Sequence, residues 1–237
     1  MMPAAVLDDR QREVRAWFDE VYATRGLAYL RPPEAYPIFL QLLGARPGER
    51  LLDIACGPGL LLRAARERSL HATGIDLSQV AVGMVERVAP GARALQANAE
   101  DMPFADGSFD HITCIGSLER FLDRRAALRE MQRVAAPGAR LCVMVRNART
   151  FGWRVLTEWR GRINHRGHQD AATLEEWTRL FAECGLSVRG VWPDQWFWQK
   201  WRNRFFPRAP GTIEPVVRRR VPLAFANEFV FILERAA

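Results

Sequence analysis

The sequence predicts an α/β fold with a mostly parallel sheet. Short apolar runs, which are typical of buried parallel strands, alternate with stretches of helical periodicity. The clearest case is a strand at 51–54, a glycine turn at 57–59 and a helix from 60 to 68. The same alternation continues with a strand at 70–76 and a helix at 79–88. This pattern favours a sheet with helices on its faces.

Later segments extend the same pattern. Residues 92–97, 111–115 and 141–146 read as further strands, with a helix between Asp123 and Val134. A turn at Ala136-Pro-Gly-Ala is expected to lead into the third of these strands. Two more strands are expected at 186–192 and 226–233, which brings the predicted sheet to seven strands.

The first 48 residues are expected to be helical. Val14, Trp17, Phe18, Val21 and Tyr22 recur at helical spacing, and Arg31-Pro-Pro then interrupts the chain. A second helix is expected from about Glu34 to Leu43, where Gly44 provides a left-handed cap. Two interpretations remain for Tyr22 and Tyr29: they face a ligand, or they pack the helices together.

Composition indicates a protein without membrane spans. Among 237 residues, 49% are hydrophobic and 26% are charged, as in ordinary globular proteins. No apolar run approaches the roughly 18 residues of a membrane span, and the first residues lack the pattern of a signal peptide. Because the cysteines lie far apart without a C-x-x-C pair, we expect reduced thiols, a cytoplasmic location and no metal site (Cys56, Cys114, Cys142, Cys184).

The stretch from Leu51 to Leu62 has the architecture of a nucleotide-type site, with a strand, a glycine turn and a helix start. A dinucleotide fingerprint would place its third glycine where Leu62 stands, so the spacing excludes that motif. Asp53 inside the strand suits an ammonium group better than a phosphate. Residues 53–59 resemble the first motif of class I S-adenosylmethionine-dependent methyltransferases, with Ala55 in the first small position.

Three further segments are similar to the same family in type, order and spacing. The strand at 70–76 ends in Asp76, and a carboxylate there can accept hydrogen bonds from both hydroxyl groups of a ribose. The run from Asn98 to Asp110 contains Met-Pro-Phe-x-Asp-x-Ser-Phe-Asp. The loop at 116–121 resembles the family's loop of small residues followed by Leu-Glu-His-Phe, except that Arg120 stands where the family often has histidine.

The resemblance implies a Rossmann-like three-layer sandwich whose last strand is antiparallel, with an N-terminal helical cap and an insertion between the last two strands. It implies the cofactor S-adenosyl-L-methionine, with S-adenosyl-L-homocysteine as the product. The aminocarboxypropyl arm would be held by Asp53 and by the main chain at Ala55, Gly57 and Ile115, and Gly59 of the same turn is also expected to bind the cofactor. The ribose and adenine would lie at Asp76, Leu77, Asn98, Ala99 and Glu100, where Asn98 departs from the usual Asp but still offers an acceptor oxygen.

We expect one methyltransferase domain over 1–237. Its parts would be a helical cap at 1–48, a cofactor-binding core at 49–148 and a substrate-side half at 149–237 that carries the insertion 193–222. His165 and His168, in a polar loop after the fifth strand, are the candidates for a general base. The alternative is that both are exposed loop histidines.

The insertion is rich in aromatic and basic residues, and much of the net charge of +7 lies between Pro193 and Arg220. Three interpretations remain for residues 194–206: a lid over the acceptor pocket, an amphipathic helix at a membrane surface, or an RNA-binding surface. The membrane interpretation would use Trp196, Trp198 and Trp201 with neighbouring arginines. No nucleic-acid-binding module is recognisable, so a nucleic acid partner is not expected.

The expected function is methyl transfer to oxygen, carbon or nitrogen of a small acceptor that is amphipathic or aromatic. The first alternative keeps the reaction but changes the acceptor to RNA or protein. The second is a protein that binds S-adenosylmethionine without catalysis. The oligomeric state stays open.

Overall fold

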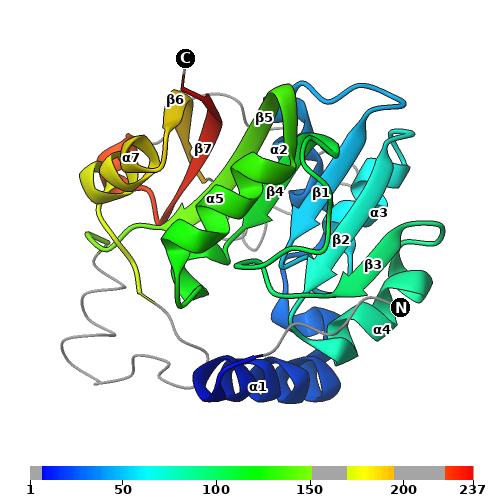
Figure 1. The fold of residues 1–237 in the computed structure, drawn as a ribbon. Coiled ribbons are helices and arrows are strands. Elements are labelled where there is room, and N and C mark those ends of the chain that lie inside the picture. The colour runs from blue at the N-terminus through cyan, green and yellow to red at the C-terminus, as the bar shows by residue number, and fades with distance from the viewer. Residues whose placement is uncertain (1–6, 151–169, 195–221, 237) are drawn as a thin grey trace, which may run out of the picture.

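The computed structural model describes residues 7–150, 170–194 and 222–236. Its strands form one sheet in the order β3-β2-β1-β4-β5-β7-β6 (Figure 1). The strands are β1 (Arg50–Ile54), β2 (His71–Asp76), β3 (Arg93–Gln96), β4 (Phe109–Ile115), β5 (Ala135–Arg146), β6 (Leu186–Pro193) and β7 (Glu228–Arg235). Only β7 opposes the direction of the others within this sheet. The predicted fold, a mostly parallel seven-stranded sheet with an antiparallel last strand, is confirmed.

Helices connect the strands and cover both faces of the sheet. They are α1 (Asp9–Arg25), α2 (Pro37–Leu43), α3 (Leu60–Arg66), α4 (Gln79–Val88), α5 (Arg124–Val134) and α7 (Leu174–Glu183). Short 3-10 turns are η1 (Gly26–Tyr29), η2 (Pro33–Ala35), η3 (Leu118–Arg120) and η5 (Leu223–Phe225). Three helix starts are fixed by side-chain caps that the sequence displays, namely Ser78, Asp123 and the capping box of Thr173.

The strand order creates a crevice. β1 pairs with β2 on one side and with β4 on the other, so the chain leaves β1 and β4 in opposite directions across the sheet. In open α/β sheets, the carboxyl ends of the strands part at such a point and leave room for a ligand. The glycine turn after β1 and the loop after β4 both open into this crevice.

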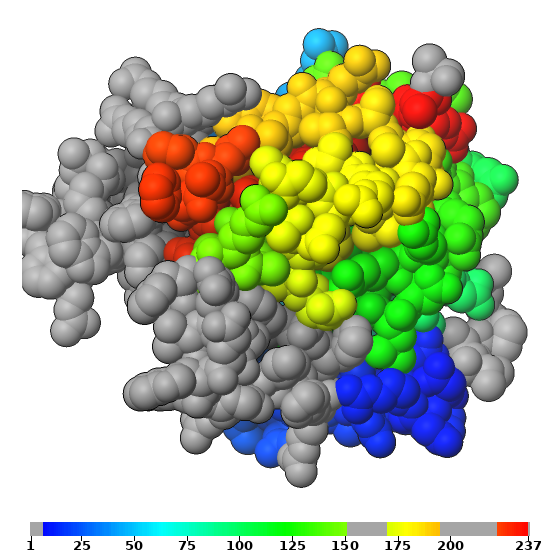
Figure 2. All heavy atoms as spheres, turned by 90° about the vertical axis from the view of Figure 1, so that its left-hand side faces the viewer, coloured from blue at the N-terminus to red at the C-terminus, as the bar shows by residue number. Residues whose placement is uncertain are grey.

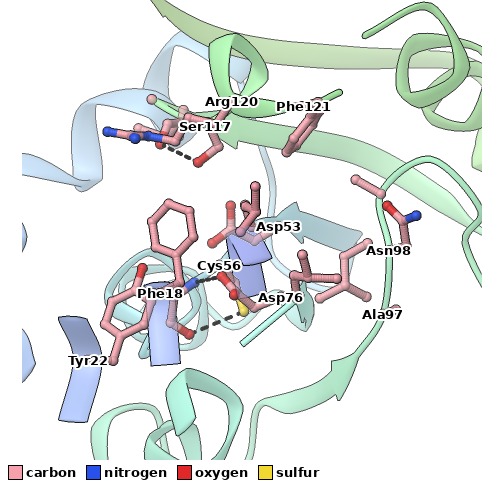
Figure 3. A pocket seen from close by; sticks show the side chains of 18 of the residues that line it. Phe18, Tyr22, Asp53, Cys56, Asp76, Ala97, Asn98, Ser117, Arg120 and Phe121 are labelled. Atoms are coloured by element: carbon pink, nitrogen blue, oxygen red, sulfur yellow. Dashed lines mark hydrogen bonds between the residues drawn. The ribbon is translucent and has the colours of Figure 1, made fainter. Parts of the chain in front are cut away.

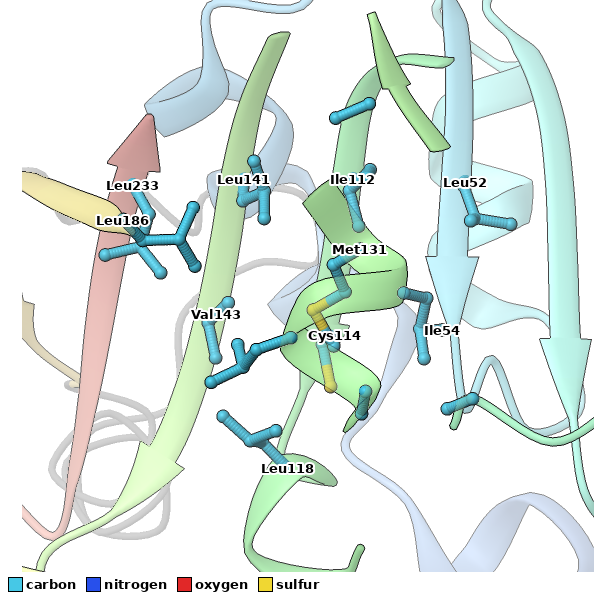
Figure 4. Close-up of a cluster of buried hydrophobic side chains, with 14 of the residues drawn as sticks. Leu52, Ile54, Ile112, Cys114, Leu118, Met131, Leu141, Val143, Leu186 and Leu233 are labelled. Carbon is cyan, nitrogen blue, oxygen red and sulfur yellow. The ribbon is translucent and has the colours of Figure 1, made fainter. Parts of the chain in front are cut away.

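Two apolar layers hold the sheet to its helices. Leu52 and Ile54 of β1 face the layer under α5 and α7, as does Met131 of α5 (Figure 4). The same layer contains the fully buried Trp177. Leu51, one position away, faces the opposite layer under α2, α3 and α4. Both faces of β1 are therefore buried, which explains why its sequence is almost continuously apolar.

The start of β5 differs from the expectation. Residues 136–139 do not form a separate turn, because β5 already begins at Ala135, opposite Phe109. The register then shifts, and His111 pairs with Arg140. Gly138, with φ +79°, lies in this bulge. A bulge lets the strand bend while its pairing continues on both sides.

The N-terminal segment crosses the carboxyl ends of the central strands, with α1 at the bottom of Figure 1. Figure 2 views the edge of the sheet where α7 (yellow) lies above α1 (blue). Arg31, after η1, is tied to the far end of the chain by ion pairs with Asp194, at 2.8 Å, and with Glu228. Among the described residues, no helix has the length and hydropathy of a membrane span.

Candidate active site

A pocket lies at the carboxyl ends of β1, β2 and β4 and is closed on one side by α1 and η1 (Figure 3). It brings together nearly all residues that the sequence predicted for the cofactor. They are Asp53, Ala55, Gly57, Asp76, Leu77, Asn98, Ala99, Glu100 and Ile115. Residues more than sixty positions apart in the chain therefore meet at one site, as the order of the strands requires.

Asp76, the last residue of β2, is held by backbone groups. Its Oδ2 accepts from the N–H of Gly57 at 2.8 Å, and its Oδ1 accepts from the N–H of Ser78 at 2.8 Å. The residue is 7% exposed. Burial raises its pKa to about 6, against the lowering effect of these hydrogen bonds. The carboxylate is thus fixed in orientation and can still accept hydrogen bonds from the hydroxyl groups of a ligand in the pocket.

Asp53, near the end of β1, is more strongly perturbed. Burial raises its pKa to about 7, the hydroxyl of Thr113 donates to its Oδ1 at 2.7 Å and lowers the pKa, and the charge of Asp76 raises it. No cation of the described chain pairs with either carboxylate. A buried acid without a counter-ion favours a ligand that carries a positive charge.

The glycine turn is shaped by left-handed backbone. Ala55 has φ +54° and Gly57 has φ +53°. A Cβ added at Gly57 would lie 2.9 Å from the hydroxyl oxygen of Tyr22, so a side chain there would collide with Tyr22 in the pocket wall. Gly59, in contrast, does not line the pocket; a Cβ there would lie 3.3 Å from Val85 of α4. Gly59 therefore lies at the start of α3, where that helix packs closely against α4.

The side chains predicted to contact adenine already make hydrogen bonds within the protein. Asn98 Oδ1 accepts from the N–H of Glu100 at 3.0 Å, which leaves one lone pair for a ligand. Glu100 Oε1 accepts from the N–H of Leu122 at 3.0 Å, and its Oε2 accepts from Gln11 Nε2 at 2.9 Å. Glu100 therefore joins α1 to the start of α5, and Asn98 with the backbone of Ala99 is better placed for adenine.

Aromatic side chains line the same pocket. Phe18, Tyr22, Tyr29, Tyr36 and Phe121 line it. Sequence periodicity identified Phe18 and Tyr22 as members of a helix, and for Tyr22 and Tyr29 it stayed open whether they face a ligand. The structure places Tyr22 and Tyr29 in the pocket wall, with ring centres 6.0 Å apart.

Several lining residues had no sequence signal. Gln11 carries no motif, Ser117 lies in the loop that resembles the family but was not singled out, and Tyr36 was hidden in a predicted helix of ordinary composition. Arg120 was noticed only as a departure from the histidine of the family. His111 lies near the start of β4, at the far end from the pocket, and its Nε2 contacts Glu49 Oε2 at 2.7 Å.

The catalytic candidates His165 and His168 lie outside the described residues, as do Trp196, Trp198 and Trp201. Glu119, another acid of the loop after β4, is buried but does not line the pocket. Within the described ranges, no group of three His, Cys, Asp or Glu residues could hold a metal ion.

The residues of the pocket fit S-adenosyl-L-methionine. The uncompensated carboxylate of Asp53 suits its amino group, and Asp76 at the end of the second strand suits the ribose hydroxyls. Gly57 lines the pocket and has no side chain between its main chain and a ligand. Leu77 offers an apolar surface beside Asn98 for a flat ring.

Known methyltransferases are similar to this chain in sequence. Residues 52–143 match the family described as a methyltransferase domain. Demethylmenaquinone methyltransferase of Renibacterium salmoninarum is 32% identical over 156 residues, which are 64% of this chain and 66% of that protein. Ubiquinone biosynthesis O-methyltransferase of Pseudomonas aeruginosa is 31% identical over 161 residues, which are 61% of this chain and 67% of that protein. The matched stretch thus spans about two thirds of these relatives.

Among solved structures, the 1,6-didemethyltoxoflavin N1-methyltransferase of Burkholderia thailandensis has a TM-score of 0.67. The superposition covers 100% of this chain and 93% of that one at 15% sequence identity, and that structure contains S-adenosylhomocysteine. This likeness supports the fold, and the sequence relatives support the family. The chain belongs to the class I S-adenosylmethionine-dependent methyltransferases.

Proposed function

We propose that the protein transfers a methyl group from S-adenosyl-L-methionine to a small acceptor that is amphipathic or aromatic. One observation carries this proposal: the predicted cofactor residues, Gly59 excepted, line a pocket that aromatic side chains line as well. The relatives named above act on quinone precursors by their names, which agrees with an acceptor of this kind.

When bound, the cofactor supplies a methyl group on a positively charged sulfur, which is a good leaving group. The protein then has to bind, orient and exclude water. Asp53 would hold the amino group of the cofactor and Asp76 its ribose. The rings of Phe18 and Tyr29, which line the pocket, would hold the acceptor in line with the methyl group. His165 and His168 remain candidates for a general base.

The proposal is tested with purified protein, methyl-labelled S-adenosyl-L-methionine and a total cell extract, followed by partition into organic, aqueous and macromolecular fractions. Label in a small organic-soluble product is expected. Asp76→Ala should lose both labelling and binding of S-adenosyl-L-homocysteine. Asp110→Ala, which removes a carboxylate from the far end of β4, is the matched control and should keep both.

Label on RNA or protein would contradict a small acceptor. Absence of label from every fraction, with binding of S-adenosyl-L-homocysteine intact, would contradict the transferase activity and favour a protein that only binds the cofactor. The domain division at 1–48, 49–148 and 149–237 is proposed with the function.

We also propose that the protein acts in the cytoplasm and reaches membrane-bound acceptors through Trp196, Trp198, Trp201 and the neighbouring arginines. The sequence pattern supports this proposal, since these residues lie outside the described ranges. Flotation with vesicles that contain anionic lipid should carry the wild-type protein upward and leave a variant with three Trp→Ser substitutions behind. Equal flotation of the two proteins would contradict the membrane contact.

A further inference from the structure

Arg120 is an incompletely paired cation in the pocket wall. It is the one lining residue of the described chain with a permanent positive charge, and it ends the η3 turn after β4. Its guanidinium carbon lies 5.5 Å from the ring centre of Phe18 and 6.0 Å from that of Trp17. Its Nη2 donates to the hydroxyl oxygen of Tyr29 at 3.5 Å. Its Nη1 is buried and has no hydrogen-bond partner among the described residues.

This arrangement has an energetic cost in the free protein. A guanidinium taken out of water needs an anion or several hydrogen bonds to offset its desolvation. The described part of the chain places no carboxylate within ion-pair distance of Arg120. Glu119 precedes it and acts on it electrostatically, yet no hydrogen bond or ion pair joins the two side chains. Aromatic rings supply part of the compensation through cation–π contacts.

The missing partner is therefore an anion that enters from the pocket. The cofactor itself carries one anion, its carboxylate, next to the amino group that Asp53 is expected to hold. The groups that set the pKa of Asp53 are its burial, Thr113 and Asp76, with no described cation among them. Arg120 instead contacts the aromatic residues of α1 and η1. Figure 3 shows Arg120 beside Ser117 on one side of the pocket, with Asp76 and Tyr22 on the other.

We propose that Arg120 binds the oxyanion of the acceptor, and that the acceptor is a hydroxylated aromatic or conjugated ring that reacts as its anion. This inference rests on the proposed methyl transfer. The rings of Phe18 and Tyr29 match a flat acceptor, and Nη1 offers a charge-assisted hydrogen bond to its oxygen. By stabilising the anion, Arg120 lowers the pKa of the acceptor hydroxyl and makes ionisation in water sufficient, so that no histidine base is required at this position.

The step balances without a further reactant. The hydroxyl proton leaves to water as the acceptor ionises beside Arg120. An electron pair of the anion, on the oxygen or on the ring carbon that shares its charge, forms the new bond to the methyl carbon. The pair of the broken carbon–sulfur bond stays on sulfur, which becomes a neutral thioether. When carbon is the attacking atom, its proton is lost to water afterwards.

The test uses 4-nitrophenol, whose anion absorbs visible light, in the presence of saturating S-adenosyl-L-homocysteine. Spectroscopic titration gives the pKa of the bound probe without any turnover. The wild-type protein should bind the anion at least about tenfold more tightly than the neutral phenol, which lowers the pKa of the bound probe by about one unit. Arg120→Met should abolish this preference, and Arg120→Lys should retain part of it.

Arg124→Met is the matched control, because Arg124 also stacks on a ring, that of Trp177 at 5.0 Å, but does not line the pocket. The pKa of 4-nitrophenol bound to Arg124→Met should equal its pKa when bound to the wild type. Thermal unfolding and the Kd of S-adenosyl-L-homocysteine are measured for every variant. An unchanged Kd in Arg120→Met, together with loss of the preference for the anion, supports the proposal.

Two results would overturn it. One is an equal pKa of the bound probe in the wild type and Arg120→Met, or no binding of the probe by either. The other is a loss of affinity for S-adenosyl-L-homocysteine in Arg120→Met while the probe still titrates normally, which would assign the cation to the cofactor. If the probe behaves as expected but no acceptor is ever methylated, the proposed function fails while the anion site stands.

Discussion

Asp53 and Asp76 are buried carboxylates at the carboxyl ends of adjacent parallel strands, and the charge of Asp76 raises the pKa of Asp53. Each is held by a donor from the protein, Thr113 for Asp53 and the N–H of Gly57 for Asp76. Neither donor carries a charge. The two acids therefore form a site of negative charge that a cationic ligand would stabilise, which links the free energy of ligand binding to their protonation.

Cofactor affinity should fall in mild acid. Asp53 has a pKa of about 7 and Asp76 of about 6 in the free protein, and a bound amino group favours the ionised form of Asp53. The Kd of S-adenosyl-L-homocysteine should be lowest above about pH 8 and rise about tenfold per unit below pH 7, because each binding event must then release a proton. Calorimetry across this range measures the change. A flat profile between pH 6 and 8 would show that Asp53 is not linked to binding.

Asp53→Asn should make the free protein more stable while it removes cofactor binding. The folded-state pKa of Asp53 is raised above its unfolded value, so its contribution to stability is fully present below the unfolded pKa and is lost as pH rises through about 7. At pH 8 the neutral amide, which still accepts from Thr113, should increase the free energy of unfolding by about 1–3 kcal/mol. Near pH 4 the gain should vanish.

Urea unfolding of the ligand-free protein measures this difference. Asp110→Asn is a control of opposite sign, because hydrogen bonds from Arg50 lower the pKa of Asp110. Asp110→Asn should not increase the free energy of unfolding at any pH above the pKa that Asp110 has in the unfolded protein. Equal stability of the wild type and Asp53→Asn at pH 8 would contradict the desolvation of this carboxylate.

Much of the fold follows from local sequence. The caps at Ser78 and Asp123 predict helix starts at the residues where they occur, because each cap satisfies backbone donors within three positions. Apolar runs locate the strands since parallel strands are buried on both faces. The bulge at 136–139 was missed because it depends on how β5 pairs with β4, which the sequence of β5 alone does not contain.

The candidate site could be predicted where a motif carries it. Asp53 and Asp76 follow from their places at strand ends. The bond from Gln11 to Glu100 joins residues 89 positions apart, and no periodicity or spacing indicates it. The stacking of Arg120 on Phe18 likewise depends on where α1 crosses the sheet. Such contacts are tertiary, so they became visible only with the structure.

Gly57→Ala should damage both the turn and the pocket. The added Cβ would lie 2.9 Å from the hydroxyl oxygen of Tyr22, and φ is +53°. We expect a loss of about 1–3 kcal/mol in the free energy of unfolding and weaker binding of S-adenosyl-L-homocysteine. Gly83→Ala, inside α4 with no atom within 4 Å of the added Cβ, is the matched control and should stabilise by about 0.5–1 kcal/mol. Equal effects of the two substitutions would show that the turn is not constrained.

Arg31→Met should loosen the N-terminal segment from the sheet. Arg31 pairs with Asp194 and Glu228, and the three side chains are only 16%, 11% and 14% exposed. Removing the cation leaves Asp194 largely buried without an ion-pair partner among the described residues and leaves Glu228 with Arg146, at 3.4 Å, which should cost about 2–4 kcal/mol in the free energy of unfolding. Arg50→Met removes an ion pair with Asp110 whose side chains are 47% and 34% exposed, so it should cost less than about 1 kcal/mol.

Urea unfolding at neutral pH separates the loss of packing at Arg31 from the loss of charge. If the uncompensated charge of the carboxylates causes the destabilisation, the triple variant Arg31→Met, Asp194→Asn, Glu228→Gln should recover part of the stability that Arg31→Met loses, because neither carboxylate charge then stays buried. If the triple variant is less stable than Arg31→Met, the contribution of Arg31 lies in its packing between η1 and the end of β6. Binding of S-adenosyl-L-homocysteine should weaken together with stability, since η1 carries Tyr29 into the pocket wall.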